Sequence, residues 1–185
     1  MQYSDKFVVP QVENVSEYLK LFSLSRTFCH LFFRKDAEID HIPELEQISA
    51  ITGVDIQPIY QMETYQEEEE LGYWLGLAEG MDESERQAIF LAAEKNRKEL
   101  DGNIQLIQKT VGNLITALSC ISDIPNRLAP TEVDVLDNST YFSKFNTDTG
   151  DGYLDNNFGQ DLRNFKRFLD SAIDAGATIV WFGFG

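Results

Sequence analysis

The stretch from Ile104 to Ile121, IQLIQKTVGNLITALSCI, is the clearest structural signal in this chain of 185 residues. Its apolar side chains recur at alternating intervals of three and four residues, which places them along one face of an α-helix. The members of this stripe are Ile104, Ile107, Val111, Leu114, Leu118 and Ile121. The stripe is too short to require a coiled-coil dimer. We therefore expect it to pack in the core of the monomer, within a central antiparallel helical hairpin.

Capping signals on either side of this stretch predict further helices. Asp82, with Glu85 three residues later, forms a capping-box pattern at a helix start. Asn157 and Gln160 give a similar signal before an apolar periodic stretch. With Pro43 and Gly53 as further boundary residues, we expect helices over 43–52, 83–100 and 158–175, and another that begins at Ser16. Residues 27–34, in the second half of the helix that begins at Ser16, also fit a strand.

Short alternating or apolar segments predict a small sheet. The final run, 177–184, is apolar on both faces, as in a buried strand. Residues 7–9, 54–57 and 132–136 have the pattern of short strands, whereas 146–157 is rich in Asn, Asp, Thr and Gly and predicts a loop. The sum is a helix-rich α+β fold, a single domain over residues 1–185, with a small β-sheet that includes the C-terminal strand.

Negative charge is concentrated in one part of the chain. The fifty residues from Asp36 to Glu85 contain fifteen carboxylates and no lysine or arginine. The whole chain has 31 acidic and 15 basic residues and a formal net charge of −16, so the acids outside this window nearly balance all the bases. Apolar residues such as Ile48 and Leu71 interleave with the carboxylates and indicate a folded segment. Such a surface attracts a basic partner and repels nucleic-acid phosphate and anionic lipid.

The sequence contains no recognisable catalytic motif. A Gly-x-Ser-x-Gly elbow, a phosphate loop, HExxH and CxxC are all missing. His30 and His41 are the two imidazoles, and His30 cannot form a dyad with adjacent Cys29 because neighbouring side chains diverge. Cys29 and Cys120 fit free, structural cysteines of a reducing compartment. We expect a protein that is not an enzyme and has no cofactor.

No segment of the sequence predicts membrane insertion. No run approaches the roughly 18 apolar residues of a membrane span, and no basic segment followed by an apolar stretch opens the chain. We expect a cytoplasmic protein.

The loop over 146–157 has some features of a calcium site. Asp148, Asp151 and Asp155 supply carboxylates, and Gly152 follows Asp151. The spacing does not match a calcium loop, which places a glycine at its sixth position. Asp and Asn are also ordinary turn residues. These three aspartates are therefore weak candidates for a metal site.

A small, strongly acidic domain without catalytic motifs resembles, in class and charge alone, the immunity proteins that protect bacteria from nuclease toxins. The resemblance implies an inhibitor that caps the positively charged groove of a basic partner. Aromatic anchors with a polar rim are typical of protein interfaces. The expected contacts are Glu67, Glu68, Glu69, Glu70, Tyr73 and Trp74, with Asp36, Glu38 and Asp40 as a second patch. The alternative interpretation of the first group is a solvated helix face with Trp74 in the core.

Two other functions remain open at this point. One is a general acidic adaptor, or nucleic-acid mimic, that docks a different basic protein. The other is a metal-dependent hydrolase that uses the loop over 146–157. The two basic clusters, Lys95, Arg97 and Lys98 and then Arg163, Lys166 and Arg167, have acids nearby and fit ordinary i,i+4 pairs better than a nucleic-acid site. The oligomeric state is left open.

Overall fold

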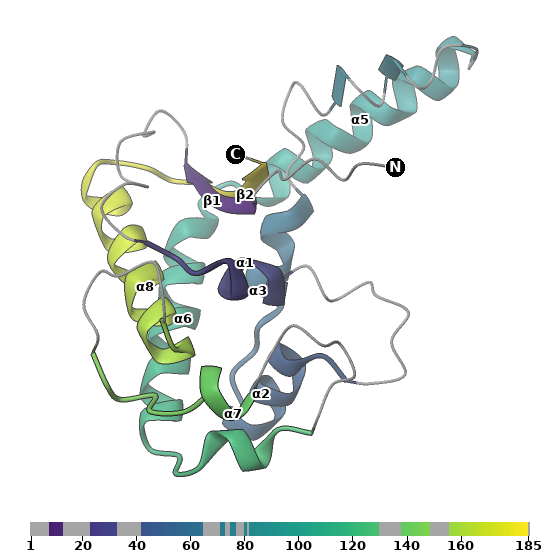
Figure 1. The fold of residues 1–185 in the computed structure, drawn as a ribbon. Helices are drawn as coiled ribbons and strands as arrows, with labels where there is room; N and C mark the ends of the chain where they lie inside the picture. The colour runs from purple at the N-terminus through teal and green to yellow at the C-terminus, as the bar shows by residue number, and fades with distance from the viewer. Residues whose placement is uncertain are drawn as a thin grey trace.

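The structure, a computed structural model, describes residues 8–12, 23–32, 42–64, 71–72, 75–76, 80, 82–129, 138–148 and 156–184 (Figure 1). In chain order the elements are β1 (Val8–Val12), α1 (Arg26–Phe32), α2 (Glu44–Thr52), α3 (Gln57–Tyr60), η2 (Gln61–Thr64), α5 (Glu83–Glu99), α6 (Asn103–Ser119), η3 (Ile124–Arg127), α7 (Asn138–Tyr141), α8 (Phe158–Asp174) and β2 (Val180–Phe184). The helix-rich α+β fold with a small sheet that includes the C-terminal strand is confirmed.

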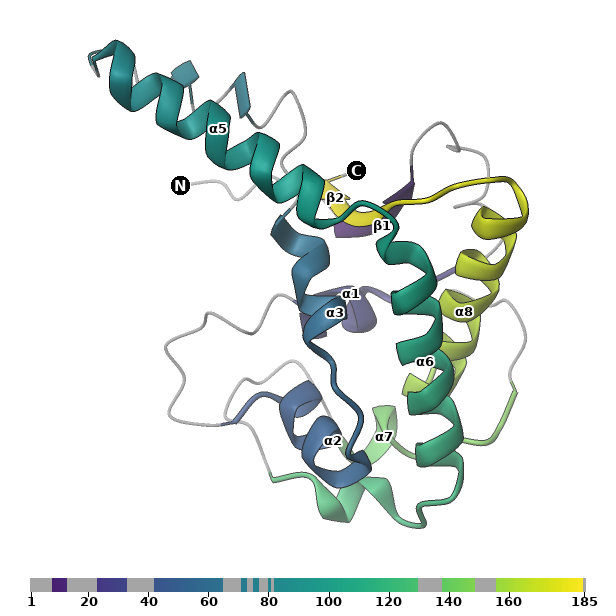
Figure 2. The same ribbon diagram turned by 180° about the vertical axis from the view of Figure 1, so that it is seen from behind.

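The central helix is α6. Its apolar stripe is fully buried inside the monomer, because Ile104, Ile107, Val111, Leu114 and Leu118 are each 0% exposed. Figures 1 and 2 show α8 running antiparallel beside α6, with α3 on the other side of α6. The central antiparallel helix pair is therefore present, and the partner of α6 is α8 rather than its neighbour in sequence, α5.

Aromatic side chains of α8 fill the space between this pair and the rest of the molecule. Phe158 and Phe165 are 0% exposed, and both rings lie against Phe28 of α1. Together with side chains from β1, α2, α3, η2, η3, α7 and β2 they form one hydrophobic core cluster. The start of α8 follows the predicted cap, since the Asn157 side-chain oxygen accepts the Gln160 N–H at 2.7 Å.

The sheet joins the two ends of the described chain. Strands β1 and β2 are antiparallel, with Val8 opposite Phe184 and Val12 opposite Val180. Pro10 lies inside β1, opposite Phe182. A two-stranded sheet leaves one edge of each strand without a partner strand, which is where proline is tolerated.

The remaining predicted segments agree with the structure in some places and differ in others. Residues 54–57 do not form a strand: α3 begins at Gln57, with Pro58 in its first turn, where the missing N–H costs nothing. Residues 27–32 belong to α1, so the helical interpretation of that segment is correct, but α1 begins at Arg26 because residues 23–25 are not helical; the predicted start at Ser16 lies outside the described residues. The predicted strand over 132–136 lies outside the described residues. Helix α2 ends as expected at Gly53, which has a φ of 69°.

Helix α5 projects from the body of the molecule (Figures 1 and 2). Its start carries the predicted capping box: the Asp82 carboxylate accepts the Glu85 N–H at 2.9 Å, and the Glu85 carboxylate accepts the Asp82 N–H at 3.0 Å. Of its own residues only Ala93 is buried, and α5 adds no side chain to the core cluster of the described chain. Across the described part of the chain, no helix is long and apolar enough to cross a membrane.

Candidate functional site

The acid-rich window of residues 36–85 is only partly described. All nine predicted partner contacts, namely Asp36, Glu38, Asp40, Glu67, Glu68, Glu69, Glu70, Tyr73 and Trp74, lie outside the described residues. The window carboxylates that are described belong to α2, η2 and the start of α5, or lie just before α3.

Several of these carboxylates lie at helix N-termini. Glu44 and Glu46 are in the first turn of α2, and Glu83 is in the first turn of α5. Asp55 accepts the Gln57 N–H at 2.9 Å at the start of α3. Free N–H groups and the helix dipole favour negative charge at these positions. Part of the acid-rich composition therefore stabilises local structure.

Carboxylates of α2 and η2 raise the pKa of one buried phenol. Tyr60 is 1% exposed. Burial first, and then the charges of Glu46, Glu63 and Glu44, raise the pKa of Tyr60 well above its usual range. These elements stand on the opposite side of α6 from α8, which carries Arg163, Lys166 and Arg167 (Figure 2). The basic cluster of α8 and these carboxylates therefore lie on different sides of α6.

A second cluster surrounds a buried carboxylate that the sequence analysis did not single out. Asp161 of α8 is 0% exposed and accepts four hydrogen bonds. Its Oδ1 accepts the Ser25 N–H and the Asn156 side-chain amide, each at 2.9 Å. Its Oδ2 accepts the Ser25 hydroxyl at 2.5 Å and the Tyr141 hydroxyl at 2.7 Å. The site therefore ties α7 and α8 to the segment that leads into α1.

This buried cluster has the character of a structural link. Burial raises the pKa of Asp161, although all four donors favour its ionised form. Burial and the Asp161 charge likewise raise the pKa of Tyr141 well above its usual range. Ser25 also accepts the Phe28 N–H at 3.1 Å, so one hydroxyl caps α1 and holds Asp161. Nucleophilic catalysis needs an accessible nucleophile and a base, and these side chains are sealed from solvent.

The sequence did contain a signal for this cluster. Asp161 lies three residues after Phe158 and four before Phe165, so it falls on the core face of α8. A carboxylate on that face requires buried donors. The donors themselves could not be inferred, because Ser25 is 136 residues away in sequence.

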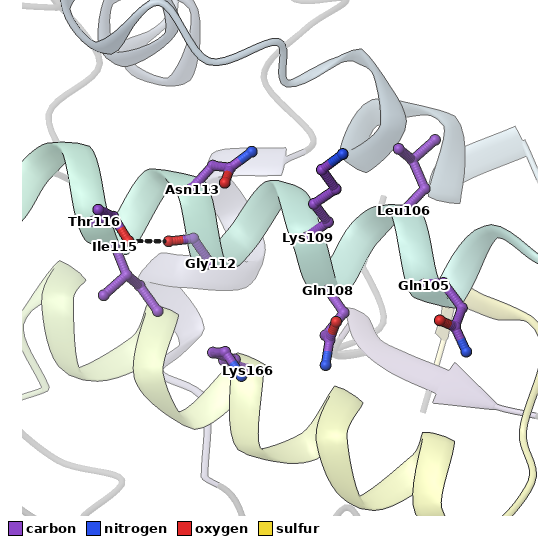
Figure 3. Close-up of a pocket in the computed structure, with 9 residues that line it drawn as sticks. All are labelled: Gln105, Leu106, Gln108, Lys109, Gly112, Asn113, Ile115, Thr116 and Lys166. Atoms are coloured by element: carbon purple, nitrogen blue, oxygen red, sulfur yellow. Dashed lines mark hydrogen bonds between the residues drawn. The ribbon is translucent and has the colours of Figure 1, made fainter.

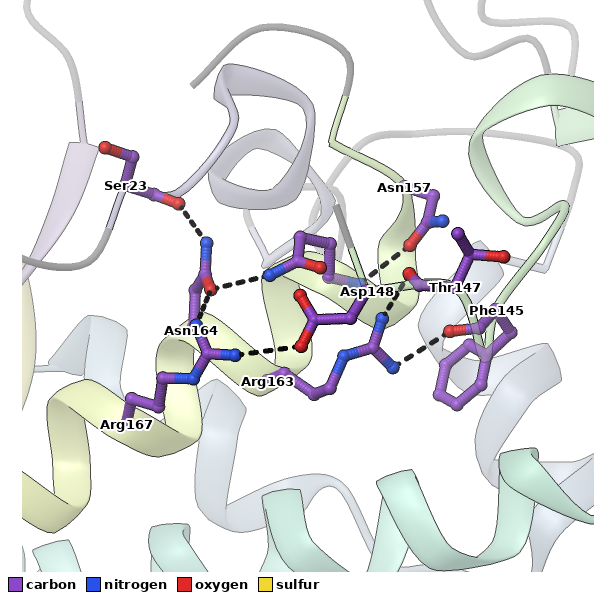
Figure 4. A network of polar contacts seen from close by, with 9 residues as sticks. Ser23, Phe145, Thr147, Asp148, Asn157, Arg163, Asn164 and Arg167 are labelled. Atoms are coloured by element: carbon purple, nitrogen blue, oxygen red, sulfur yellow. Dashed lines mark hydrogen bonds and ion pairs between the residues drawn. The ribbon is translucent and has the colours of Figure 1, made fainter. Parts of the chain in front are cut away.

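The weak metal candidate is described at one of its three residues. Figure 4 shows Asp148 facing Arg167, with 3.3 Å between the carboxylate and the guanidinium. Beside it, Arg163 donates to the Phe145 and Thr147 carbonyls at 2.9 and 2.7 Å. Two guanidinium groups give this region a positive local charge. Asp151 and Asp155 lie outside the described residues, and within the described ranges no three His, Cys, Asp or Glu side chains gather as metal ligands.

A shallow groove runs along the outer side of α6 and α8. It has a volume of about 730 Å³, and three carboxamides, the Thr116 hydroxyl and two lysines are among the groups that line it. Figure 3 shows Gln108 and Ile115 directed toward α8, while Lys109 and Asn113 point away from it. Lys166 is paired with Asp170 at 2.7 Å, and Gln108 donates to the same carboxylate at 2.7 Å. The charge of Lys166 is therefore neutralised within the protein.

The described basic clusters and cysteines largely follow the predictions. Lys95 pairs with Glu99 at 3.6 Å, and Lys166 pairs with Asp170, both at i,i+4 spacing. Both cysteines are free. Cys29 is buried, and burial raises the pKa of its thiol to about 12. Cys120 is exposed, although its apolar surroundings in sequence suggested burial.

Comparison with family models, with curated proteins and with solved structures finds no match to this chain.

Proposed function

We propose that this protein is an acidic inhibitor that binds a basic protein, in the manner of an immunity protein that neutralises a nuclease-type toxin. The proposal rests on the window of residues 36–85, which contains fifteen carboxylates and no lysine or arginine. A nuclease needs a positive groove for the phosphates of its substrate. A dense, one-signed surface is steered toward such a groove and forms the complex quickly.

The distribution of charge in the described chain supports this proposal. Of the three carboxylates that raise the pKa of Tyr60, on the side of the molecule away from α8, Glu46 is exposed, Glu63 is half-buried and Glu44 is buried. Every lysine and arginine of the chain lies outside the window. A basic partner that approached the window would meet no lysine or arginine of the window itself, although exposed Arg26 lies on α1, which contacts α2. The carboxylates of the window repel one another, and the positive charge of a basic partner would offset this repulsion.

The experiment uses the basic protein encoded beside this one, in a catalytically inactive form, as the binding probe. Association rates are measured by stopped-flow at several salt concentrations. We expect fast 1:1 binding whose rate falls steeply as salt is added. With an active probe, the inhibitor should block nucleic-acid cleavage.

A charge-matched pair of variants tests the surface. One variant carries Glu67→Lys, Glu68→Lys and Glu69→Lys; the control carries Glu99→Lys, Asp101→Lys and Asp174→Lys, which are exposed and outside the window. Both sets change net charge equally. We expect the first set to slow association by about tenfold or more and the control to have a much smaller effect. Equal rates for the two variants would rule out steering by this patch. Binding without inhibition of cleavage would favour the adaptor function.

A further inference from the structure

The outward face of α5 is largely exposed to solvent. From Asp82 to Ala92 every residue except Ile89 is exposed. Phe90 and Leu91, in the middle of the helix, are 47% and 55% exposed. A helix of this length is only marginally stable alone in water, and tertiary packing normally supplies most of its stability. Two large apolar side chains at its centre indicate that this face has a partner.

The residues of this face are arranged symmetrically about the middle of the helix. Ala93, which is buried, marks the side of α5 that faces the body of the molecule. At 100° per residue, one outward face of α5 gathers Glu83, Gln87, Phe90, Leu91, Glu94 and Lys98. Reversing the helix about the point between Phe90 and Leu91 maps this set onto itself. Each residue before that point takes the place of one after it, at the same distance from the centre. A second α5 in antiparallel orientation would place the equivalent positions opposite one another.

Reversal also makes the charges complementary. It brings Glu83 of one copy opposite Lys98 of the other, and it does so twice because the arrangement has two-fold symmetry. Gln87 meets Glu94, which allows amide-to-carboxylate hydrogen bonds, and Phe90 meets Leu91 at the centre. Within the described chain, Glu83, Glu94 and Lys98 have no side-chain hydrogen bond or ion pair. A shallow hollow of about 370 Å³ beside Leu91, lined also by Glu94 and Lys98, lies on this face.

We propose that α5 is a self-association surface, through which two copies of this chain pair by antiparallel packing of their α5 helices. A single projecting helix buries little area, at the low end of protein interfaces, so the dimer is weak and depends on concentration. The net charge of −16 opposes association of the two bodies. At physiological ionic strength the Debye length is about 8 Å, so this long-range repulsion is screened more than the contact pairs.

The test is analytical ultracentrifugation of the full chain at physiological ionic strength. The wild-type protein should show a monomer–dimer equilibrium. Glu83→Lys and Lys98→Glu should each weaken dimerisation by about tenfold, because each replaces two attractive pairs by two repulsive ones. The combined variant, Glu83→Lys with Lys98→Glu, restores both pairs and should recover the wild-type association constant to within about threefold.

The combined variant separates pairing from effects on the helix itself. Both substitutions oppose the helix dipole, so recovery in the combined variant cannot come from a more stable α5. Leu91→Asp should abolish the dimer, and Asp174→Lys, an exposed change of the same charge outside α5, should leave it unchanged. A monomer at every concentration would overturn the proposal. So would a combined variant weaker than either single one, or an Asp174→Lys variant as weak as Glu83→Lys.

Discussion

Asp161 shows how differently one residue type is used in this chain. Most described carboxylates are exposed or lie at helix starts, whereas Asp161 is sealed among Ser25, Tyr141 and Asn156. An unpaired buried charge would be strongly destabilising, but four donors surround this one. Its role is therefore to fix where the segment before α1 meets α8.

The pH dependence of stability tests the state of this carboxylate. Because burial raises the folded pKa of Asp161 above its unfolded value, its contribution to stability is fully present below the unfolded pKa and is lost as pH rises through the folded pKa. Asp161→Asn does not titrate and leaves donors unpaired, so it should cost about 1–3 kcal/mol. In urea unfolding from mildly acidic to neutral pH, the difference between wild type and variant should shrink as pH rises.

Tyr141→Phe provides the companion measurement. It keeps the Asp161 carboxylate but removes a donor that lowers its pKa. The loss of stability with rising pH should then extend to higher pH than in the wild type. A wild-type advantage over Asp161→Asn that grew with pH would contradict the prediction, because it would place the folded pKa below the unfolded one.

At the scale of elements, local signals predicted structure well. The capping box at Asp82, the Asn157 cap and the glycine after α2 each act within a few residues, so their sequence patterns suffice. The choice of α8 as the partner of α6 could not be predicted, since it depends on packing between distant segments. The alternation at 54–57 predicted a strand, but Pro58 and the packing of Ile59 favoured a short helix.

The functional residues were harder to predict than the elements. The acid-rich window was evident from composition, but three of its described carboxylates, Glu44, Glu46 and Glu63, act on Tyr60, and the predicted contacts lie outside the described residues. Of the donors to Asp161, Ser25 and Tyr141 are 136 and 20 residues away in sequence, and no local pattern marks them. The exposed face of α5 was also missed, because Phe90 and Leu91 fit a core stripe as well as a surface until the direction of the helix is known.

Two glycines on neighbouring helices should respond to alanine in opposite directions. A Cβ at Gly159, in the first turn of α8, would lie 2.0 Å from the backbone oxygen of Phe145. Gly159→Ala should therefore destabilise the fold by about 1–3 kcal/mol or more, as overpacking does. A Cβ at Gly112 of α6 would meet nothing closer than the Lys166 Cε at 3.9 Å. Gly112→Ala should stabilise by about 0.5–1 kcal/mol through helix propensity.

Urea unfolding of the two variants and the wild type measures whether each substitution lowers or raises the free energy of unfolding. The pair controls for the loss of backbone freedom, because each replaces a helical glycine by alanine. If Gly159→Ala were as stable as Gly112→Ala, the close approach of α8 to the Phe145 backbone would be wrong.

At the scale of the whole molecule, the two proposals assign different partners to two surfaces of different charge pattern. The side of α2 and α3 carries carboxylates and lies in the base-free window, which suits a basic protein. Helix α5 carries acids near its start and bases near its end, which suits a reversed copy of itself. The two proposals share one carboxylate, Glu83, but the charge-swapped α5 variant leaves Glu67 to Glu70 untouched, so each can be tested without changing the other's main contacts. A dimer would present two acidic windows.

The whole fold also depends on how the two chain ends are joined to the central helix. The Asn103 side chain, at the start of α6, donates to the Val180 carbonyl at 2.7 Å and accepts the Val180 N–H at 2.8 Å. Val180 begins β2, which pairs with β1 and brings Val12 opposite Val180. One amide side chain therefore connects α6 to the sheet formed by both ends. Breaking this link should weaken the entire cooperative unit, since Val180 and Phe182 belong to the core.

Asn103→Ala removes both bonds and should lower the free energy of unfolding by about 1–3 kcal/mol, because the Val180 backbone groups are left unpaired. Asn103→Asp keeps the acceptor and places a negative charge at the start of a helix, so its loss should be smaller. Gln105→Ala, an exposed neighbour on α6, is the control and should stay within about 0.5 kcal/mol of wild type. Hydrogen exchange at the Val180 amide, measured beside urea unfolding, locates the effect. Equal stability of Asn103→Ala and Gln105→Ala, with unchanged protection at Val180, would mean that strand pairing alone holds the chain ends.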